Sequence, residues 1–380
     1  MDNDAQRTSP SAPADPVPAN MRAMVLTGHG GIDKLVFRDD LPTPAPTDGE
    51  VLVRVGACGM NNTDINTRTG WYDEVVESSV SEELGMRGRT DGAASSWNRS
   101  TVAFPRIQGA AVVGHIVGVG RGVEAARIGE RVIVDPSVRD TSLPLHAQLV
   151  QYLGSERDGG YADYVAVPAV NAHWVESPFS DAELATFPCS YDTAEEMLQR
   201  TRLAEGETLV ITGAAGGVGT ALVQLATLRG ARIVAVASAA KEERLRSLGV
   251  HEFVARESDD VQREIERLIG ERGAHVAADV VGGPMFDSLL KVLRRGGRYA
   301  TAGAIAGPVT RIDLRDLIYK DLEMHGITNP TAATFARLVE LIETGRLRPL
   351  LEETYPLRDL PRGQAQLLKR RHIGKLVVVT

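Results

Sequence analysis

Two different hydrophobic patterns divide the chain near residue 180. From Met21 to about Glu176, apolar residues stand in short β-branched runs such as VLVRV, RVIV and YADYVAV, which Gly, Pro and Asp separate. Runs of this kind are typical of strands in a β-rich, barrel-like domain. From about Ser180 the pattern becomes strand, glycine-rich turn and helix, repeated several times. This alternation predicts an α/β domain with a doubly wound parallel sheet.

The second pattern also gives the order of the elements. Strands are predicted at 208–212, 232–237, 276–281 and 298–301, and helices after the glycine turn, over 241–248 and over 285–293. Apolar residues at 335, 338, 339 and 342 have helical spacing, and KLVVV from Lys375 predicts a final strand that can return to the first domain. We therefore expect residues 21–177 and 330–380 to form the β-rich domain and residues 178–329 the α/β domain. The first 20 residues, rich in Pro, Ala, Ser and Asp, are predicted to be a disordered tail.

The length and the net charge of the chain indicate which kinds of molecule it can bind. The 380 residues, 43% of them hydrophobic, can bury two cores, and the formal net charge of −8 disfavours nucleic acid or an anionic membrane as a partner. A small-molecule substrate is the expected partner, and a homodimer the expected assembly. The two cysteines, Cys58 and Cys189, cannot build a disulfide framework or a four-cysteine zinc site. Without a signal peptide or a long apolar run, the sequence predicts a cytoplasmic protein that does not cross a membrane.

The most specific motif is TLVITGAAGGVG at 208–219. A strand leads through a glycine turn into a helix, so bare backbone amides can approach a pyrophosphate at the helix N-terminus. Strict GxGxxG spacing is not met, because Ala214 holds the first position and Gly213 comes one residue earlier. Glycines that only close a tight turn are the alternative. The predicted dinucleotide contacts are Gly213, Ala214, Ala215, Gly216, Gly217, Val218, Gly219 and, further along, Gly303.

The end of the second predicted strand of this domain bears on the choice of cofactor. An acidic residue there would bind the ribose 2′-hydroxyl of NAD, but the strand ends on Val236, Ala237 and Ser238, and Lys241 and Arg244 follow. A hydroxyl followed by cations suits a 2′-phosphate, which predicts NADPH. The alternative is that Lys241 and Arg244 only form the solvated face of a helix.

Several landmarks together resemble the medium-chain dehydrogenase/reductase superfamily over residues 21–380. They are GEVLVRVGACGMNNTDINTRTGWY at 49–72, GAAVVGHIVGVG at 109–120, RIGERVIV at 127–134, GGYADYVAVPA at 159–169, the glycine turn, DVVGG at 279–283 and GKLVVV at 374–379. The resemblance implies a GroES-like β-barrel catalytic domain made from both chain ends, an inserted Rossmann domain, and an active site in the cleft between them. The variant glycine turn is similar to that of zinc-free quinone oxidoreductases.

The same resemblance implies that this chain holds no metal. Zinc-dependent members place a Cys, a His and a second Cys around the ion, and here those positions hold Asn61, Ala110 and Cys189. Cys189 alone cannot replace the three protein ligands that a catalytic zinc ion needs. We expect His115 to be an ordinary strand residue and Cys189 to be an inert residue at a helix start, with a nucleophilic or redox role of Cys189 as the alternative.

The segment from Asn61 to Tyr72 is the predicted catalytic segment. Its D-I-N-x-x-x-G-x-Y spacing resembles quinone oxidoreductases and mitochondrial-type enoyl thioester reductases, which points to Tyr72 and Asn61 as neutral donors to a developing oxyanion. Thr63 matches the proton-relaying hydroxyl of alcohol dehydrogenases, and Asp64 is expected to orient its neighbours. A Tyr72 without any catalytic part is the alternative.

Three functions remain open from the sequence. The leading one is the NADPH-dependent, metal-free reduction of a quinone or of an α,β-unsaturated carbonyl or thioester. The others are a zinc-free alcohol or carbonyl dehydrogenase with Thr63 as relay, and an NADP(H)-binding protein without turnover. Two stretches, at 73–103 and 135–158, are longer than the resemblance leads us to expect. The first is predicted to be a mobile flap over the substrate entrance.

Overall fold

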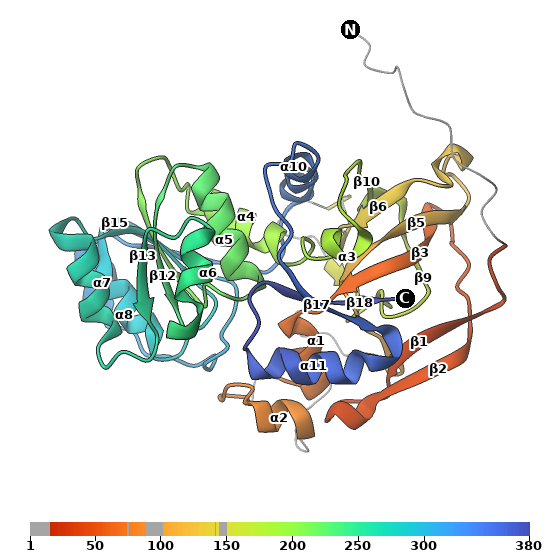
Figure 1. Cartoon of the computed structure of the whole chain (residues 1–380), viewed down its shortest axis with the longest axis horizontal. Helices are drawn as coiled ribbons and strands as arrows, with labels where there is room; N and C mark the ends of the chain where they lie inside the picture. Colours follow the sequence, from red (N-terminus) through yellow and green to blue (C-terminus); the bar gives the residue numbers. More distant parts are fainter. Residues whose placement is uncertain (1–15, 74–75, 89–101, 141, 144–149) are drawn as a thin grey trace, which may run out of the picture.

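The computed structural model describes residues 16–73, 76–88, 102–140, 142–143 and 150–380. Two lobes stand side by side: a nucleotide lobe with the parallel sheet and a β-rich lobe that holds the first and the last strand of the described chain (Figure 1). The predicted combination of a β-rich domain and a doubly wound α/β domain is therefore confirmed. Most of the predicted tail lies outside the described residues, and the first strand, β1 (Asn20–Leu26), already begins at Asn20.

The nucleotide lobe contains one six-stranded sheet. Its strands run in the order β13-β12-β11-β14-β15-β16, and every neighbouring pair is parallel. The order reverses between β11 and β14, which is where α/β sheets of this kind bind ligands. The strands are β11 (Thr208–Thr212), β12 (Arg232–Ala237), β13 (Glu252–Ala255), β14 (Ala274–Asp279), β15 (Leu293–Thr301) and β16 (Glu323–Gly326).

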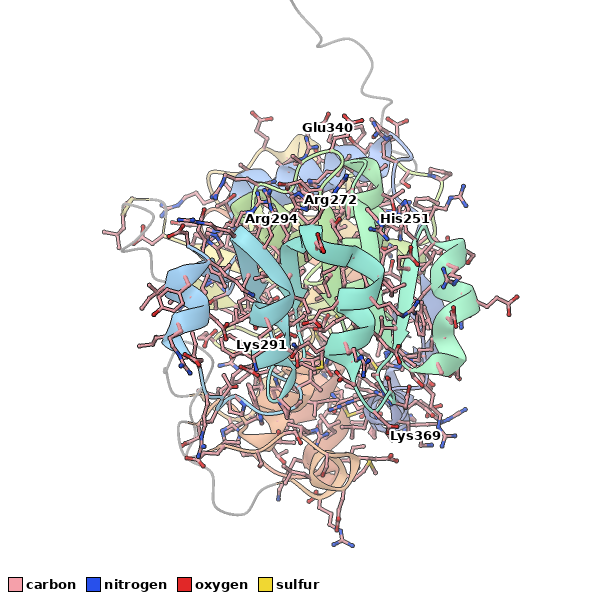
Figure 2. All side chains as sticks on the ribbon, turned by 90° about the vertical axis from the view of Figure 1, so that its left-hand side faces the viewer. His251, Arg272, Lys291, Arg294, Glu340 and Lys369 are labelled. Atoms are coloured by element: carbon pink, nitrogen blue, oxygen red, sulfur yellow. The ribbon has the colours of Figure 1, made fainter. Side chains whose placement is uncertain are left out.

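Alternate side chains of these strands pack on opposite faces of the sheet. Leu209 and Ile211 of β11 join the core with α4 and α5, whereas Val210 joins the core with α7 and α8. This period of two explains why the strands are hydrophobic along their whole length. The helices of this lobe are α4 (Tyr191–Arg200), α5 (Gly217–Leu228), α6 (Glu242–Ser247), α7 (Val261–Ile269), α8 (Met285–Val292) and α9 (Leu314–Tyr319), with 3-10 turns η5 (Ala239–Lys241) and η6 (Gly270–Arg272). Figure 2 shows the outer face of this lobe, where Arg272 and Lys291 are exposed.

The β-rich lobe is built on a sheet in the order β10-β6-β5-β3-β18-β17, and β9 also pairs with β3. The final strand, β18, pairs with β3 through Val378 and Cys58, so the C-terminus lies inside this lobe. A second sheet has the order β2-β1-β4, and β7 pairs with β8. The strands are β2 (Leu35–Pro42), β3 (Glu50–Gly59), β4 (Arg106–Ile107), β5 (Ala111–Val119), β6 (Arg131–Val134), β7 (Ser137–Arg139), β8 (Val150–Tyr152), β9 (Tyr164–Pro168), β10 (Ala172–Trp174), β17 (Leu351–Pro356) and β18 (Lys375–Val379).

Helices lie around this lobe and along the cleft. α10, which follows residue 330, packs against α4, and Phe335 and Leu338 are buried in the core of the nucleotide lobe. The predicted limits of the two domains stay a prediction. The elements are η1 (Ile32–Lys34), α1 (Asn62–Thr69), α2 (Glu82–Arg87), η2 (Ala125–Arg127), η4 (Ala169–Asn171), α3 (Asp181–Leu184), α10 (Ala332–Glu343), η7 (Leu357–Asp359) and α11 (Leu360–Lys369). No helix in the described part of the chain is long and apolar enough to cross a bilayer.

The described part of the predicted flap is anchored rather than free. Its helix α2 packs against α11, and a side chain at Gly85 would collide with Leu368. The fully buried Arg68 of α1 donates hydrogen bonds to Gly85 O (2.8 Å), Gly30 O (3.0 Å) and Gln364 Oε1 (2.9 Å). A guanidinium has enough donors to tie three segments at once, which holds α2 beside the cleft. The centre of the predicted flap, residues 89–101, lies outside the described residues.

Candidate active site

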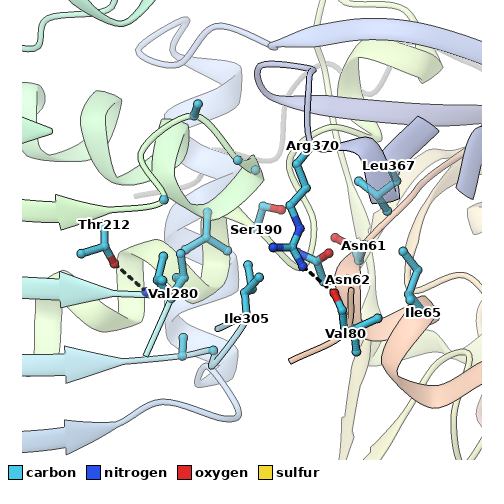
Figure 3. A pocket seen from close by; sticks show the side chains of 18 of the residues that line it. Asn61, Asn62, Ile65, Val80, Ser190, Thr212, Val280, Ile305, Leu367 and Arg370 are labelled. Carbon is cyan, nitrogen blue, oxygen red and sulfur yellow. Dashed lines mark hydrogen bonds between the residues drawn. The ribbon is translucent and has the colours of Figure 1, made fainter. Parts of the chain in front are cut away.

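A cavity of about 510 Å³ lies in the cleft between the two lobes. Figure 3 shows Thr212, Val280 and Ile305 of the nucleotide lobe on one side, and Asn61, Asn62, Ile65 and Leu367 of the β-rich lobe on the other. The carboxyl ends of β11, β12 and β14 open into it, at the point where the strand order reverses. The cavity therefore lies where the strand order predicts a ligand site.

The glycine turn forms one wall of the cavity. Five of the seven predicted contacts line it: Gly213, Ala215, Gly216, Gly217 and Val218. Gly213 has a φ of +59°, which favours glycine, and a Cβ at Gly216 would have only Gly213 O within 4 Å, at 3.6 Å. Bare backbone thus meets the ligand space at the start of α5, where the first helical amides have no partner within the helix. These residues fit the pyrophosphate of a dinucleotide.

Two residues of the turn have a packing role instead. Ala214 is buried and Gly219 lies behind the turn, where a Cβ would stand 2.2 Å from Gly213 O. Neither residue lines the cavity. Gly303 does line it, as predicted for a cofactor contact.

Basic side chains line the part of the cavity that contains Ser238. Lys241 lines it, and so do Arg256 and Arg370, which the sequence analysis did not select. Lys241 Nζ donates to the carbonyls of Arg370 (2.8 Å) and His372 (2.7 Å), which ties α6 to the end of α11. Arg370 in turn donates to Val80 O at 2.8 Å, beside α2 (Figure 3). Among the described residues, no aspartate or glutamate lines the cavity.

The structure does not bring Arg244 to the cavity. Its guanidinium forms an ion pair with Glu352 at 2.7 Å, outside the lining residues. The carboxylate of Glu257 accepts hydrogen bonds from the Ser238 hydroxyl and from the Ala239 amide (3.1 Å), although it is outside the lining. The spacing of residues along the helix could not predict the Arg244–Glu352 ion pair, because Glu352 comes from β17 in the other lobe.

The catalytic segment forms α1, with Asn61 as its N-cap. Asp64 is fully buried and does not line the cavity; its carboxylate accepts hydrogen bonds from the Asn61 amide (2.8 Å) and the Tyr161 hydroxyl (2.6 Å). Burial raises the pKa of Asp64 to about 6, against the hydrogen bonds that lower it. This geometry agrees with an orienting role, since Asp64 fixes the start of the helix that carries Asn61 and Thr63.

Tyr72 and Thr63 meet across the end of α1. Gly70 ends the helix with a φ of +70°, so the chain turns back and the Tyr72 hydroxyl donates to Thr63 Oγ1 at 3.0 Å. Burial raises the pKa of Tyr72 to about 12, so the phenol is neutral at ordinary pH. Both side chains line the cavity with Asn61. The structure thus brings three of the four predicted catalytic residues to one surface.

Lys375 and Ser190 also line the cavity, although sequence reasoning selected neither. Lys375 Nζ donates to Asn61 Oδ1 and to Ser190 Oγ (3.3 Å), and burial lowers the pKa of this ammonium. The only sequence signal was GKLVVV, which served as a family landmark. Pairing of β18 with β3 is what carries Lys375 to the cleft.

The positions that hold zinc ligands in related enzymes are occupied by side chains poorly suited to a metal. Asn61 and Ala110 provide neither a thiolate nor an imidazole, and burial raises the pKa of the free Cys189 thiol to about 12. His115 lies within β5 opposite Arg54, as expected of a strand residue. Within the described ranges, no group of three His, Cys, Asp or Glu side chains could hold a metal ion.

Comparison with known proteins places this site in a family. Residues 47–177 match the model of the alcohol dehydrogenase GroES-like domain, and residues 217–344 match that of the zinc-binding dehydrogenases. The crystal structure of a putative alcohol dehydrogenase from Sinorhizobium meliloti 1021 is 49% identical, covers 96% of this chain and 97% of its own, and superposes with a TM-score of 0.87. The chain belongs to the medium-chain dehydrogenase/reductase superfamily. It is therefore an oxidoreductase of a superfamily that binds NAD(P)H, with the GroES-like and Rossmann domains of its members.

Named relatives of this superfamily member differ in their reactions. An acryloyl-coenzyme A reductase from Metallosphaera sedula is 27% identical over 95% of this chain and 100% of its own length. A quinone oxidoreductase from Lama guanicoe is 26% identical over 91% of this chain and 93% of its own. The zinc-binding dehydrogenase match covers residues 217–344, which include none of Asn61, Ala110 and Cys189. The family name is thus no argument for a metal at these positions.

Proposed function

We propose that this superfamily member uses NADPH to reduce a carbon–carbon double bond conjugated to a carbonyl, or a quinone, without a metal. The observation that carries the proposal is the Tyr72–Thr63 hydrogen bond, with Asn61 nearby, on the wall of a largely apolar chamber. Apolar neighbours exclude water and strengthen each hydrogen bond to the acceptor. The chamber residues are Ile65, Trp71, Val80, Met285, Ile305, Leu367 and Leu368.

Neutral donors suit a conjugated acceptor better than an isolated ketone. A bound reduced nicotinamide supplies a hydride. Addition at the β-carbon spreads the negative charge between the α-carbon and the carbonyl oxygen, so Tyr72 and Asn61 have to stabilise only part of it. Tyr72, with its pKa near 12, keeps its proton until charge develops on the acceptor. Thr63 accepts the phenol proton in the structure. With an acceptor bound, Tyr72 would turn this proton toward the acceptor and accept a hydrogen bond from the Thr63 hydroxyl, so that Thr63 still holds the phenol in place.

The lining charges support NADPH over NADH. Lys241, Arg256 and Arg370 surround the Ser238 end of the cavity, and the described lining holds no carboxylate that would repel a 2′-phosphate. Losing a charge-assisted contact costs about 1.5 to 3 kcal/mol, so Lys241→Ala and Arg256→Ala should each raise the Kd for NADPH about tenfold or more. The Kd for NADH should change little. Arg244→Ala is the matched control, because Glu352 already pairs with that guanidinium. Equal losses for both cofactors would mean that Lys241 acts only by holding the carbonyls of residues 370 and 372.

The metal-free part of the proposal has two physical supports. Asn61 and Ala110 offer neither a thiolate nor an imidazole, and the Lys375 ammonium stands against Asn61, where it would repel a divalent cation. We expect full activity in chelator and no stoichiometric zinc by elemental analysis. About one zinc per chain, with activity lost on its removal, would overturn this part.

The reaction itself is tested by one comparison of substrates. NADPH oxidation should be followed with an enone, its saturated ketone, a quinone, an enoyl thioester and an aldehyde, and NADP⁺ reduction with the matching alcohol. We expect turnover of the enone or the quinone and none of the saturated ketone. Oxidation of the alcohol without reduction of the enone would favour the second candidate, a zinc-free alcohol dehydrogenase, which the cavity-facing Thr63 supports. NADPH binding without turnover of any acceptor would leave a binding protein.

A further inference from the structure

A buried cation stands in the catalytic half of the cleft. Lys375, the first residue of β18, is 4% exposed, and its Nζ donates to Asn61 Oδ1 and Ser190 Oγ. Within the described part of the chain no carboxylate forms an ion pair with it. Asp64 lies nearby, but its carboxylate is already bound to the Asn61 amide and the Tyr161 hydroxyl. An unpaired buried ammonium destabilises the fold, so its presence beside the predicted donors calls for a functional reason.

The path of the Lys375 side chain shows which half of the cavity its ammonium reaches. A Cβ at Gly217 would stand 2.8 Å from Lys375 Cδ and 2.6 Å from Ser190 Oγ, so the stem crosses the start of α5. The head continues beyond the glycine turn to Asn61. An ammonium has three N–H groups, and the described residues accept two of them, so one is left for a ligand in the cavity.

We propose that Lys375 is a catalytic residue whose ammonium binds the carbonyl or quinone oxygen of the acceptor and stabilises the negative charge that develops there. Ser190 and the Asn61 Oδ1 atom position this ammonium, and the Asn61 amide group remains a neutral donor to the same oxygen. This inference rests on the proposed function. In the step, hydride adds to the β-carbon, the electron pair of the C=C bond forms a new double bond to the carbonyl carbon, and the carbonyl pair moves to oxygen. A proton from Tyr72, replaced from water, then adds to the α-carbon as the C=O bond re-forms, which gives the saturated product and NADP⁺.

The role resembles that of a metal in chemical terms. An ammonium at a water-poor site stabilises an oxyanion as a Lewis acid does, and its Nζ contacts Asn61, one of the positions that hold ligands in zinc-dependent relatives. The competing role is a contact to the cofactor phosphates, because the stem passes α5. The two roles make different predictions for kcat and for cofactor affinity.

The test compares Lys375→Met, Lys375→Arg and the exposed control Lys369→Met. With saturating NADPH and an enone, Lys375→Met should lower kcat by about 100-fold or more, the loss expected for one oxyanion donor, while the Kd for NADPH changes less than about threefold. Lys375→Arg should restore part of kcat, and Lys369→Met should match the wild type. The loss should be smaller with a quinone, which spreads the charge over its ring. An unchanged kcat with a Kd for NADPH raised tenfold would overturn the proposal in favour of a phosphate contact.

A second measurement does not depend on turnover. 4-Nitrophenol, whose absorbance distinguishes phenol from phenolate, should bind to the NADP⁺ complex of the wild type as phenolate and to Lys375→Met more weakly and as the neutral phenol. Identical ionisation in both proteins would overturn the proposal. If the wild type reduces no enone or quinone, the proposed function fails, but this titration still decides the role of Lys375. Should Lys375→Met not fold, Ser190→Ala should lower kcat several-fold at an unchanged Kd for NADPH, and an unchanged kcat would count against the proposed positioning.

Discussion

At the scale of single residues, substitutions of Tyr72 and Thr63 distinguish the proposed enone or quinone reductase from a zinc-free alcohol dehydrogenase. Tyr72→Phe should lower kcat by about 10-fold to 1000-fold with NADPH affinity unchanged, as expected for loss of a general acid or oxyanion donor. Because the pKa of Tyr72 is raised to about 12, this phenol should cause no loss of kcat as the pH rises to about 10. Steady-state kinetics with an enone, together with a cofactor titration, check both points.

Thr63→Val provides the contrast to that experiment. The hydroxyl of Thr63 accepts from Tyr72, so its loss should misplace the phenol and lower kcat less than Tyr72→Phe does. If Thr63→Val is instead the more damaging change and the alcohol is the better substrate, Thr63 relays protons as in an alcohol dehydrogenase. The role given to Tyr72 would then be wrong.

A buried carboxyl group of α4, outside the cavity lining, makes the stability of the fold depend on pH. Asp192 of α4 is 1% exposed, and burial, followed by the charge of Asp135, raises its pKa from near 3.8 to about 7. The folded state therefore binds the proton more tightly than the unfolded chain. This difference in proton binding stabilises the folded state fully below about pH 4, and the stabilisation is lost as the pH rises to about 7. At about 1.4 kcal/mol per pKa unit, it amounts to at most about 4 kcal/mol.

Asp192→Asn removes this titration. We expect the free energy of unfolding to fall less from pH 5 to pH 8 in the variant than in the wild type, as measured by urea denaturation. Asp64, with a pKa of about 6, titrates in the same range in both proteins, so the difference between them isolates Asp192. Parallel pH curves for the two proteins would show that Asp192 keeps its ordinary pKa.

At the scale of elements, the glycine turn offers a matched pair of substitutions. A Cβ at Gly219 would stand 2.2 Å from Gly213 O, so Gly219→Ala must push the strand from the helix and destabilise the fold. A Cβ at Gly216 would have no neighbour closer than 3.6 Å but would enter the cavity. Gly216→Ala should therefore keep the wild-type melting temperature and raise the Kd for NADPH.

Thermal melting and cofactor titration of the two variants check this pair. A Gly216→Ala protein that binds NADPH normally would show that the pyrophosphate does not approach the start of α5. A Gly219→Ala protein with normal stability would show that the strand and helix can separate at no cost.

The elements also show what the sequence could predict. The strands that were predicted correctly, β11, β12, β14 and β15, contain mostly buried segments, and in β11 and β12 these are β-branched runs. Two of them have other bounds than predicted: β14 covers residues 274–279 rather than 276–281, and β15 covers 293–301 rather than 298–301. β16, with the sequence EMHG, has no buried residue and so no hydrophobic pattern to detect. α1, with the sequence NTDINTRT, has one apolar side chain, and its buried Asp64 and Arg68 depend on partners from distant segments. α7 was missed although Ile265 and Ile269 have helical spacing.

Some residues of the candidate site could likewise be predicted from the sequence, and others could not. Asn61, Thr63 and Tyr72 lie in one continuous segment whose family spacing is readable, so they could be named before the fold was known. Arg256 and Lys375 reach the cavity through strand pairing across long sequence distances. Arg244 was wrongly grouped with Lys241, because helix spacing says nothing about Glu352 in the other lobe.

At the scale of the whole molecule, one edge of the nucleotide lobe is apolar and exposed. β16 ends the six-stranded sheet, and Met324 on it is 42% exposed. On the neighbouring α9, Leu314, Ile318 and Tyr319 are 57%, 61% and 73% exposed. Apolar surface beside an open sheet edge favours association with another chain. Two copies related by a twofold axis can pair their β16 strands antiparallel and cover both patches.

We therefore predict a homodimer that forms through β16 and α9. Replacing Ile318 and Tyr319 together by Asp should convert the dimer to a monomer in light-scattering and sedimentation measurements at micromolar concentration. Both side chains are exposed, so the charged residues should not unfold the chain. Val170→Asp is the control, since Val170 is 82% exposed on η4 of the other lobe and should leave the mass unchanged.

The same variant separates assembly from catalysis. Among the described residues that line the cleft cavity, none belongs to β16 or α9. The monomeric variant should therefore keep the wild-type Kd for NADPH, although its melting temperature should fall because the exposed apolar edge is no longer covered. A wild type that is already monomeric, or a double variant whose mass does not change, would show that this edge is not the subunit contact. A monomer that folds but no longer binds NADPH would show that the cleft depends on the partner chain.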